Sequence, residues 1–411
     1  MRIGSPGRRA LIVGGASALA IVVVVLAAAF AVGWFDSDEV TGSAEGFEPG
    51  AVVAADAAAG DWPEYGLNRR RTRANPALDL APPFRTDWTV DAGSLLEFPP
   101  VLEDGNLFVG TNRGLALSVE AATGRVRWRV RLPGRVASSP AIAGDDVLIA
   151  TLKGDLLALR QSDGSTRWRL ALGSAIESSP LVADGSAYVG TLDGRVLRID
   201  LASRDIVWTA RAEGDVKASV ALLDDAVVVG DYGGSVSAYG RSDGRVVWRR
   251  ESPGPRFRGP GRFYAGPAVA YGRVYIGNIN GRMVALDADD GSIAWVRAFD
   301  DFVYSSAAVD DETVYVGSYD QRLYALDAVT GATRWSFDAG ERISGAPTVL
   351  GDLVYASTLA RDPADGRSFA VDAATGRQVW EFPDGRYTPA LGVEGLLVLT
   401  GTRRLYGLRP E

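Results

Sequence analysis

The side chains best suited to chemistry in this sequence form a row of mostly polar residues that recurs along the chain. Each member lies three residues before a position that is usually proline. The row consists of Glu97, Ala137, Glu177, Lys217, Tyr264, Tyr304, Ser344 and Arg386. Carboxylates, cations and phenols in one row are able to bind an ion or the polar groups of a partner. The row is therefore a candidate binding site, and the alternative is a solvated rim of balanced charge.

A second candidate lies in residues 252–264, where arginine and aromatic residues alternate. Such a mixture is favoured at interface hot spots, and variable loops on a rigid scaffold often carry binding. The residues are Arg256, Phe257, Arg258, Arg262, Phe263 and Tyr264. We expect them to contact an acidic peptide or an anionic glycan, with help from Tyr304 and Arg386. The alternative is a tolerated insertion without a partner.

Two missing residue types narrow the chemistry. The 411 residues contain no cysteine and no histidine. Disulfides, Cys/His zinc sites, thiol nucleophiles and Ser-His-Asp triads are therefore excluded. The formal net charge of −8 also argues against a nucleic-acid partner.

The elements that must position these side chains belong to a repeat of about 40 residues. Tryptophan recurs at Trp88, Trp128, Trp168, Trp208, Trp248, Trp295, Trp335 and Trp380. Between tryptophans, short β-rich runs such as 187–190 and 195–199 alternate with Asp-Gly turn signals. Four such runs per repeat predict an all-β fold, an eight-bladed β-propeller of four-stranded blades in which tryptophan fills the gaps between blades.

The ends of the repeat predict how the ring closes. The residues after Trp380 suffice for three strands and contain no further tryptophan. We expect residues 85–90, which include Trp88, to supply the fourth strand of that blade. Joining the first and last segments in one sheet would remove two exposed edges.

The N-terminal residues predict a membrane anchor. Residues 10–35 carry no charge, and a helix of that length spans about 39 Å, more than the roughly 30 Å of a bilayer core. Arg2, Arg8 and Arg9 precede it, which places the N-terminus in the cytoplasm. We expect a cytoplasmic stub (1–9), a transmembrane signal-anchor helix (10–35), a flexible extracytoplasmic linker (36–60) and the propeller (61–411). A cleaved signal peptide is the alternative.

The repeated pattern Asp-x-x-Thr/Asp-Gly-x-x-x-Trp is followed by Tyr-Val-Gly-x-x-Asp-Gly, with Ser-Pro twelve residues after the tryptophan. Over residues 62–408 it resembles the pyrroloquinoline-quinone-like (PQQ-like) propeller repeat family. That family includes quinoprotein alcohol dehydrogenases and non-enzymatic relatives such as the BamB lipoprotein of outer-membrane assembly. The chain lacks the lipid-anchor cysteine of the BamB pattern, which puts a direct role in that assembly in doubt.

The dehydrogenase branch implies PQQ with calcium, for which Glu97, Glu177, Asp301 and Arg386 are the available ligands. The missing cysteines and the compact repeats argue against it, so we expect no cofactor, no metal and no catalysis.

The resemblance favours a membrane-anchored, extracytoplasmic scaffold for protein interaction in the cell envelope, on the BamB-like branch. A PQQ-dependent dehydrogenase and a module that binds or senses cell-wall polymer are the alternatives. Partners would be the cytoplasmic membrane, through the helix, and an envelope protein or cell-wall polymer. We expect the basic run Arg69–Arg71 and Arg73 to be a solvated surface segment, and a contact with an anionic polymer is the alternative.

Overall fold

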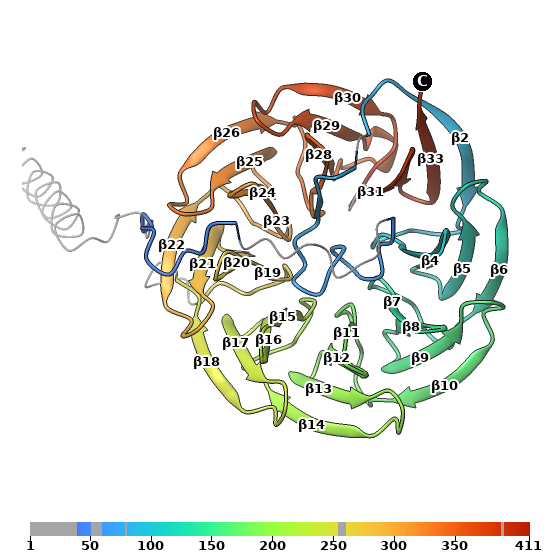
Figure 1. Cartoon of the computed structure of the whole chain (residues 1–411), viewed down its shortest axis with the longest axis horizontal. Helices are drawn as coiled ribbons and strands as arrows, with labels where there is room; N and C mark the ends of the chain where they lie inside the picture. The colour runs from blue at the N-terminus through green and yellow to red at the C-terminus, as the bar shows by residue number, and fades with distance from the viewer. Residues whose placement is uncertain (1–38, 51–59, 79, 254–259, 388–389) are drawn as a thin grey trace, which may run out of the picture.

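The computed structural model describes residues 39–50, 60–78, 80–253, 260–387 and 390–411. Eight antiparallel sheets stand around a central channel, and this confirms the eight-bladed propeller (Figure 1). Within these ranges no helix is long and apolar enough to cross a bilayer. The predicted helix at 10–35 lies outside the described residues and stays a prediction.

Each blade is a meander whose strands run in sequence order from the channel outward, except that β2 is the outermost strand of blade 8. Blades 1 to 4 contain β3 (Val101–Glu103), β4 (Asn106–Gly110), β5 (Leu115–Glu120) and β6 (Val126–Arg131); β7 (Ala141–Ala143), β8 (Asp146–Ala150), β9 (Asp155–Arg160) and β10 (Thr166–Ala171); β11 (Leu181–Ala183), β12 (Ser186–Gly190), β13 (Arg195–Asp200) and β14 (Ile206–Arg211); β15 (Ala221–Leu223), β16 (Ala226–Gly230), β17 (Ser235–Gly240) and β18 (Val246–Glu251).

Blades 5 to 8 contain β19 (Ala268–Ala270), β20 (Arg273–Asn278), β21 (Arg282–Asp287) and β22 (Ile293–Ala298); β23 (Ala308–Asp310), β24 (Thr313–Gly317), β25 (Arg322–Asp327) and β26 (Thr333–Asp338); β27 (Thr348–Leu350), β28 (Leu353–Ser357), the 3-10 turn η1 (Pro363–Asp365), β29 (Ser368–Asp372) and β30 (Gln378–Phe382); β31 (Ala390–Val393), β32 (Leu396–Thr400), β33 (Arg404–Pro410) and β2 (Phe84–Asp91).

The ring closes as the sequence predicts. Strand β2 pairs antiparallel with β33, with Phe84 opposite Pro410 and Asp91 opposite Arg404. The first and last segments of the propeller therefore share one sheet, and blade 8 has its full set of four strands.

Six of the eight repeated tryptophans bond their blade to the next one. The Trp295 indole N–H donates to the Ala328 carbonyl of blade 6 over 2.9 Å, and its ring lies against Gly331. Gly331 has a φ of 75°, and a Cβ there would lie 2.8 Å from the indole ring, so only glycine fits the turn. The same bond to the next blade is made by Trp88, Trp128, Trp208, Trp248, Trp295 and Trp335.

A second fastening lies closer to the channel, in the row directly before the polar row. It consists of Leu96, Val136, Ile176, Val216, Phe263, Val303 and Ile343, all of them at most 2% exposed. Each side chain inserts against a neighbouring blade. At Gly277, for example, a Cβ would lie 2.2 Å from Val303, so the glycine at the end of the second strand makes room for the next blade.

Residues 60–78, here called the channel segment, lie at the centre of the ring, where Figure 1 shows them in blue. Their two-residue strand β1 (Ala74–Asn75) pairs parallel with β27 of blade 7. Arg71 and Arg73 are at most 1% exposed, and Arg71 lies 3.0 Å from Glu64 in a buried ion pair. The expectation of a solvated segment is wrong for both arginines, because they are buried inside the channel. Arg71 pairs with Glu64 and donates to the Val220 and Pro180 carbonyls, and Arg73 donates to the Arg71 and Ala307 carbonyls.

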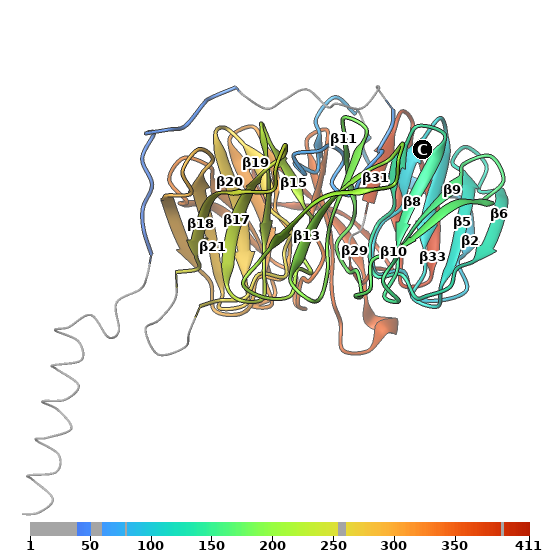
Figure 2. The ribbon, with the colours of Figure 1, turned by 90° about the horizontal axis from the view of Figure 1, so that it is seen from below.

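Residues 39–50, here called the strap, run along the outside of blade 5 (Figure 2). The sequence analysis expects a flexible linker here. The strap instead pairs with the outer strand, where Val40 and Val296 exchange both backbone hydrogen bonds. Phe47 of the strap packs into the apolar core formed by blades 5 and 6.

Candidate functional site

The loops that connect successive blades bring the polar row together at one mouth of the channel. Five of its members line a single cavity of about 60 Å³. These are Glu97, Lys217, Tyr264, Tyr304 and Ser344. Glu177 lies beside the cavity, 3.3 Å from Lys217, and the Arg386 guanidinium lies 5.6 Å from the ring centre of Tyr387, which also lines it. The shared loop position predicts this convergence because equivalent residues of all blades face one axis.

Tyr65 of the channel segment also lines this cavity, so the site combines blade loops with the segment inside the channel. The Arg73 guanidinium lies 4.3 Å from the centre of the Tyr65 ring. Burial raises the pKa of Tyr65, but Arg73, Ser306 and Arg71 outweigh it and lower that pKa. Positive charge behind a phenol therefore favours hydrogen-bond donation from this side of the cavity.

Five aromatic side chains, here called the aromatic arc, extend from the cavity across blades 4 to 6. They are Tyr232, Tyr264, Phe302, Tyr304 and Tyr319. Their ring centres lie 6.5 Å apart from Tyr232 to Tyr264, 5.1 Å from Tyr264 to Tyr304, and 4.9 Å from Tyr304 to Tyr319. Phe302 is 43% exposed, which is unusual for a large apolar side chain.

Cations flank the arc at both ends. Lys217 and Arg262 lie 5.0 and 5.9 Å from the ring centre of Tyr232, and Arg342 lies 5.5 Å from that of Tyr319. Burial raises the pKa of Tyr232 and of Tyr264, and nearby acidic groups add to the effect. These phenols therefore remain protonated at neutral pH and keep their hydrogen-bond donors.

The arc is confined to one side of the channel mouth. The loop position that holds Tyr232 and Tyr319 in blades 4 and 6 holds Leu152 and Leu192 in blades 2 and 3. The row that holds Tyr264 and Tyr304 has Ala137 between blades 1 and 2. Tyr232, Phe302 and Tyr319 are not among the residues that the sequence predicts for the site. Comparing the repeats at the residue two after each strand-end glycine would have found two of them.

The structure places the second candidate set only in part. Arg256, Phe257 and Arg258 lie outside the described residues. Arg262 is exposed beside Tyr232, as a contact residue should be. The prediction that Phe263 contacts a partner is wrong, because its side chain is 1% exposed and packs between blades 4 and 5.

The same chain matches one family along most of its length. The family model described as outer membrane protein assembly factor BamB matches residues 85–152, 141–302, 232–328 and 303–410. The chain belongs to this family. No curated protein matches the sequence.

Solved structures share the fold of this BamB family member. BamB from Moraxella catarrhalis is 18% identical, with a TM-score of 0.65 over 80% of this chain and 98% of that one. Quinohemoprotein alcohol dehydrogenase from Comamonas testosteroni is 16% identical, with a TM-score of 0.71 over 86% of this chain and 81% of that one. A europium-containing methanol dehydrogenase is 13% identical, with a TM-score of 0.72 over 85% and 98%. At these identities the likeness shows the fold alone.

The acidic side chains at the channel mouth of this BamB family member are spread apart. Among the described residues no group of three or more Asp or Glu side chains is placed to hold a metal ion. Of the ligands that the resemblance offers, only Glu97 lines the cavity. Glu177 is engaged by Lys217, and the Asp301 carboxylate accepts the backbone N–H of Phe302. The carboxylates are therefore dispersed rather than converged on one point.

Proposed function

We propose that this chain is a membrane-anchored, extracytoplasmic β-propeller that binds a partner in the cell envelope and performs no catalysis. The observation that carries the proposal is the aromatic arc with its flanking cations, on one side of a rigid channel mouth. Tyrosine and arginine dominate interface hot spots because they bury large areas and keep polar handles.

The scaffold supports this role because it holds the arc rigidly. The rings contact one another across blades 4 to 6, and tryptophan bonds join blade 4 to blade 5 and blade 5 to blade 6. Binding then requires little ordering of the side chains, which lowers the entropic cost of association. Membership of the BamB family is consistent with an interaction role.

The cellular location rests on the uncharged residues 10–35 and on the arginines before them. Intact-mass analysis of the protein extracted from membranes tests the anchor. We expect a mass that retains residues 1–35. A mature chain that begins near Val32 would replace the anchor with a cleaved signal peptide.

Site-specific photocrosslinking in the native cells tests the binding role. A photoreactive residue at Phe302 is compared with one at Ala175, which has the same loop position on the other side of the channel mouth. We expect a discrete protein adduct from position 302 and none from position 175. Equal adducts from both positions, or none from either, would contradict the proposal. A polydisperse adduct that lysozyme-type digestion collapses would favour the cell-wall polymer.

A dehydrogenase is the second candidate, because two solved structures of similar fold are quinoprotein dehydrogenases. Reconstitution of the full chain with PQQ and Ca²⁺, followed by dye-linked alcohol oxidation, decides between the two. We expect neither saturable PQQ binding nor turnover, because the carboxylates do not converge. Saturable binding with turnover would replace the binding role by an enzymatic one.

A further inference from the structure

The strap shows how an extended segment docks between two blades of this propeller. Its Val40 pairs with Val296 at the free edge of β22, with N–H to O distances of 3.0 and 2.9 Å. The Gly42 N–H then donates to the Thr330 carbonyl of blade 6 over 3.1 Å. The segment thus extends the sheet of blade 5 and crosses into the groove between blades 5 and 6.

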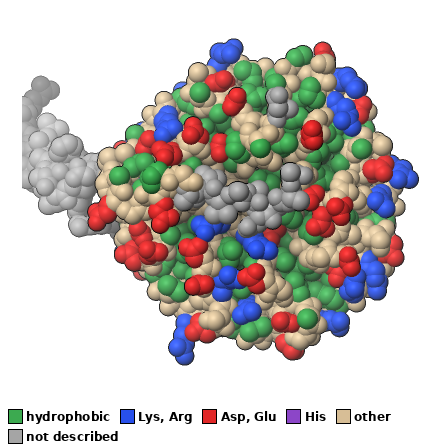
Figure 3. Space-filling view, in the orientation of Figure 1, with side chains coloured by type: hydrophobic (Ala, Val, Ile, Leu, Met, Phe, Trp, Pro, Cys, Tyr) green, Lys and Arg blue, Asp and Glu red, His purple; other side chains and the backbone are tan. Residues whose placement is uncertain are grey.

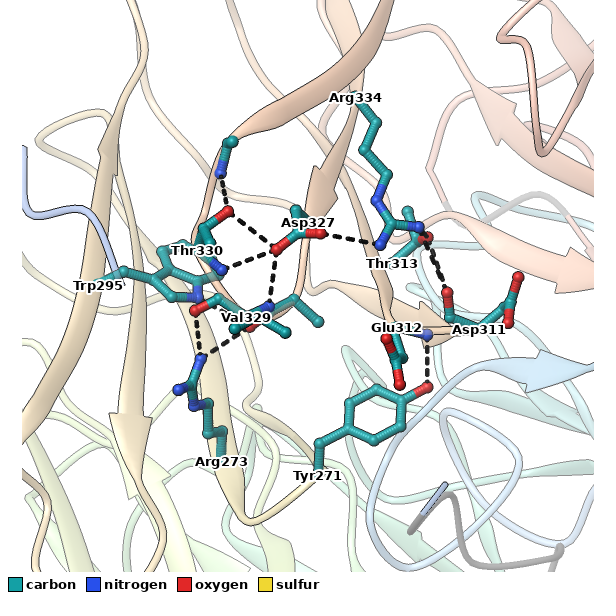
Figure 4. A network of polar contacts seen from close by, with 12 residues as sticks. Tyr271, Arg273, Trp295, Asp311, Glu312, Thr313, Asp327, Val329, Thr330 and Arg334 are labelled. Atoms are coloured by element: carbon teal, nitrogen blue, oxygen red, sulfur yellow. Dashed lines mark hydrogen bonds and ion pairs between the residues drawn. The ribbon is translucent and has the colours of Figure 1, made fainter. Parts of the chain in front are cut away.

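Two arginines of blade 5 hold the strap in that groove. Arg273 donates to the Ser43 carbonyl over 2.6 Å, and Glu39 lies 3.4 Å from Arg297. Figure 4 shows Arg273 of blade 5 beside Trp295 and Val329, and Tyr271 beside Glu312. Of the strap's three glutamates, Glu39 pairs with Arg297 through its carboxylate, whereas Arg273 donates to the backbone carbonyls of Ser43 and Glu45. Trp295 is fully buried beneath the strap.

The groove between blades 6 and 7 repeats this architecture, and no comparable strap from the described residues lies in it. It is a cavity of about 740 Å³ whose walls occupy the same repeat positions. Trp335 stands where Trp295 stands, Ala373 where Ala328 stands, and Asp352 where Glu312 stands. Trp335 is half-buried, unlike Trp295. Strand β26 forms the edge of its sheet, as β22 does in blade 5.

The charge of this second groove is inverted. Asp311 replaces Tyr271, Thr313 replaces Arg273, and Phe337 replaces Arg297. Asp310 and Asp352 add two further carboxylates to the wall. Arg334 does not neutralise them, because it is bonded to Asp327 over 2.9 Å and to Thr313 over 2.6 Å (Figure 4).

The carboxylates in this wall repel one another. Burial raises the pKa of Asp310 to about 6, and the charges of Asp311 and Asp352 contribute to the shift. A bound cation would offset the cost of keeping a partly buried carboxylate charged, and it would weaken the repulsion between the carboxylates.

We propose that the groove between blades 6 and 7 is a docking site for an extended, basic peptide segment of a partner protein. The free edge of β26 supplies backbone hydrogen bonds, Trp335 supplies the apolar floor, and Asp310, Asp311 and Asp352 pair with lysine or arginine. The strap in the neighbouring groove is the structural template, and the inverted charge selects the opposite sign of peptide. This site is separate from the aromatic arc and does not depend on the function proposed for it.

A labelled peptide with the sequence of residues 39–50 and the changes Glu39→Lys, Glu45→Lys and Glu48→Lys is the probe. Its binding to the full-length chain is measured by fluorescence anisotropy, next to that of the unchanged acidic peptide. We expect saturable binding of the basic peptide with a Kd below about 1 mM, and binding of the acidic peptide at least tenfold weaker.

Two matched double variants locate the site. Asp311→Asn/Asp352→Asn should weaken binding of the basic peptide at least tenfold. Asp104→Asn/Asp145→Asn removes the same turn carboxylates from the groove between blades 1 and 2, and should change binding less than twofold. Asparagine tolerates the positive φ of Asp104 and Asp311, so both variants keep their turns.

A third variant tests the backbone contact. Ser336 occupies the position of Val296, whose N–H bonds the strap, so Ser336→Pro removes an edge N–H without breaking the sheet. We expect this variant to bind the basic peptide at least fivefold more weakly and to keep an unchanged melting temperature. Lack of saturable binding at about 1 mM, or equal loss in both double variants, would overturn the proposal.

Discussion

Two adjacent positions in the blade-connecting loops have opposite properties. Ile343 is fully buried and meets Gly317 of the preceding blade, whereas Ser344, one residue later, lines the channel cavity. The first position is apolar in seven of the eight loops, and the second varies from glutamate to tyrosine to arginine. Packing between blades thus constrains one position and leaves its neighbour free to differ.

This difference explains how a symmetric scaffold acquires an asymmetric surface. Six tryptophans make the same bond to the next blade. The aromatic arc, in contrast, occupies blades 4 to 6 alone. Changes at shared positions should therefore alter stability, and changes at variable positions should alter binding.

Removing the closing strand should have the largest effect. Deletion of residues 84–91 takes away β2 and Trp88 and exposes the edge of β33. We expect loss of cooperative unfolding or a destabilisation of several kcal/mol, because a large apolar side chain and a full strand pairing disappear. Thermal unfolding followed by circular dichroism measures it. An unchanged melting temperature would mean that blade 8 does not need β2.

The adjacent pair Ile343 and Ser344 tests the comparison directly. Ile343→Ala should destabilise the protein by about 2–5 kcal/mol, because it leaves a cavity between two blades. Ser344→Ala should change stability by about 1 kcal/mol or less, since it loses one hydrogen bond with Tyr319. Urea denaturation measures both. Equal losses would show that the two rows do not differ in role.

The pH dependence of stability should reveal Asp310, an acidic residue at a position that is mostly apolar in other blades. Its pKa of about 6 exceeds the unfolded value of about 3.9, so the folded state binds more protons between these values. The free energy of unfolding should therefore fall as pH rises from about 4 to about 6. Asp310→Asn should flatten this profile and raise the melting temperature at neutral pH. A variant with the wild-type profile would contradict this account.

The smallest expected effect concerns a departure from the shared turn. Arg204 has a φ of 70° at the position where other blades place glycine against a tryptophan. A left-handed conformation costs a non-glycine residue roughly 1–2 kcal/mol, partly offset by the greater unfolded-state entropy of glycine. Arg204→Gly should stabilise the protein by about 0.5 kcal/mol in the same denaturation experiment. A destabilised variant would contradict this expectation, because it would mean that contacts of the Arg204 side chain outweigh the cost of its left-handed backbone conformation.

The sequence predicts the shared features because they depend on residues close together in the chain. The spacing of tryptophan predicts the number of blades, and the Asp-Gly turns predict where the strands begin and end. The absence of a fourth strand after Trp380 predicts that β2 closes the ring. The polar row was found because it keeps a fixed distance from a proline. Tyr319 lies at a fixed distance from Gly317, so the repeats show it as a variable position, but its contact with Tyr304 depends on the fold because the two residues belong to different loops.

Long-range partners also explain the two wrong expectations about basic and acidic segments. The burial of Arg71 depends partly on the Val220 and Pro180 carbonyls, which lie more than a hundred positions away in the sequence. The strap lacks apolar periodicity, and its contacts come from single residues such as Val40 and Phe47. Neither pattern can be recognised within a local window of sequence.

The route of the channel segment has a consequence for folding. Its backbone and the Glu64 side chain accept N–H groups from Leu102, Ile142, Val182, Leu222, Val269, Val309 and Val349, one from the innermost strand of each of seven successive blades. In a linear repeat array each unit contacts only its neighbours, so stability is nearly a sum of local terms. Here one short segment is synthesised before all of its binding partners and can settle only when seven of them surround it. It couples distant blades to one another, so we expect the ring to gain its final order in a single late step rather than blade by blade.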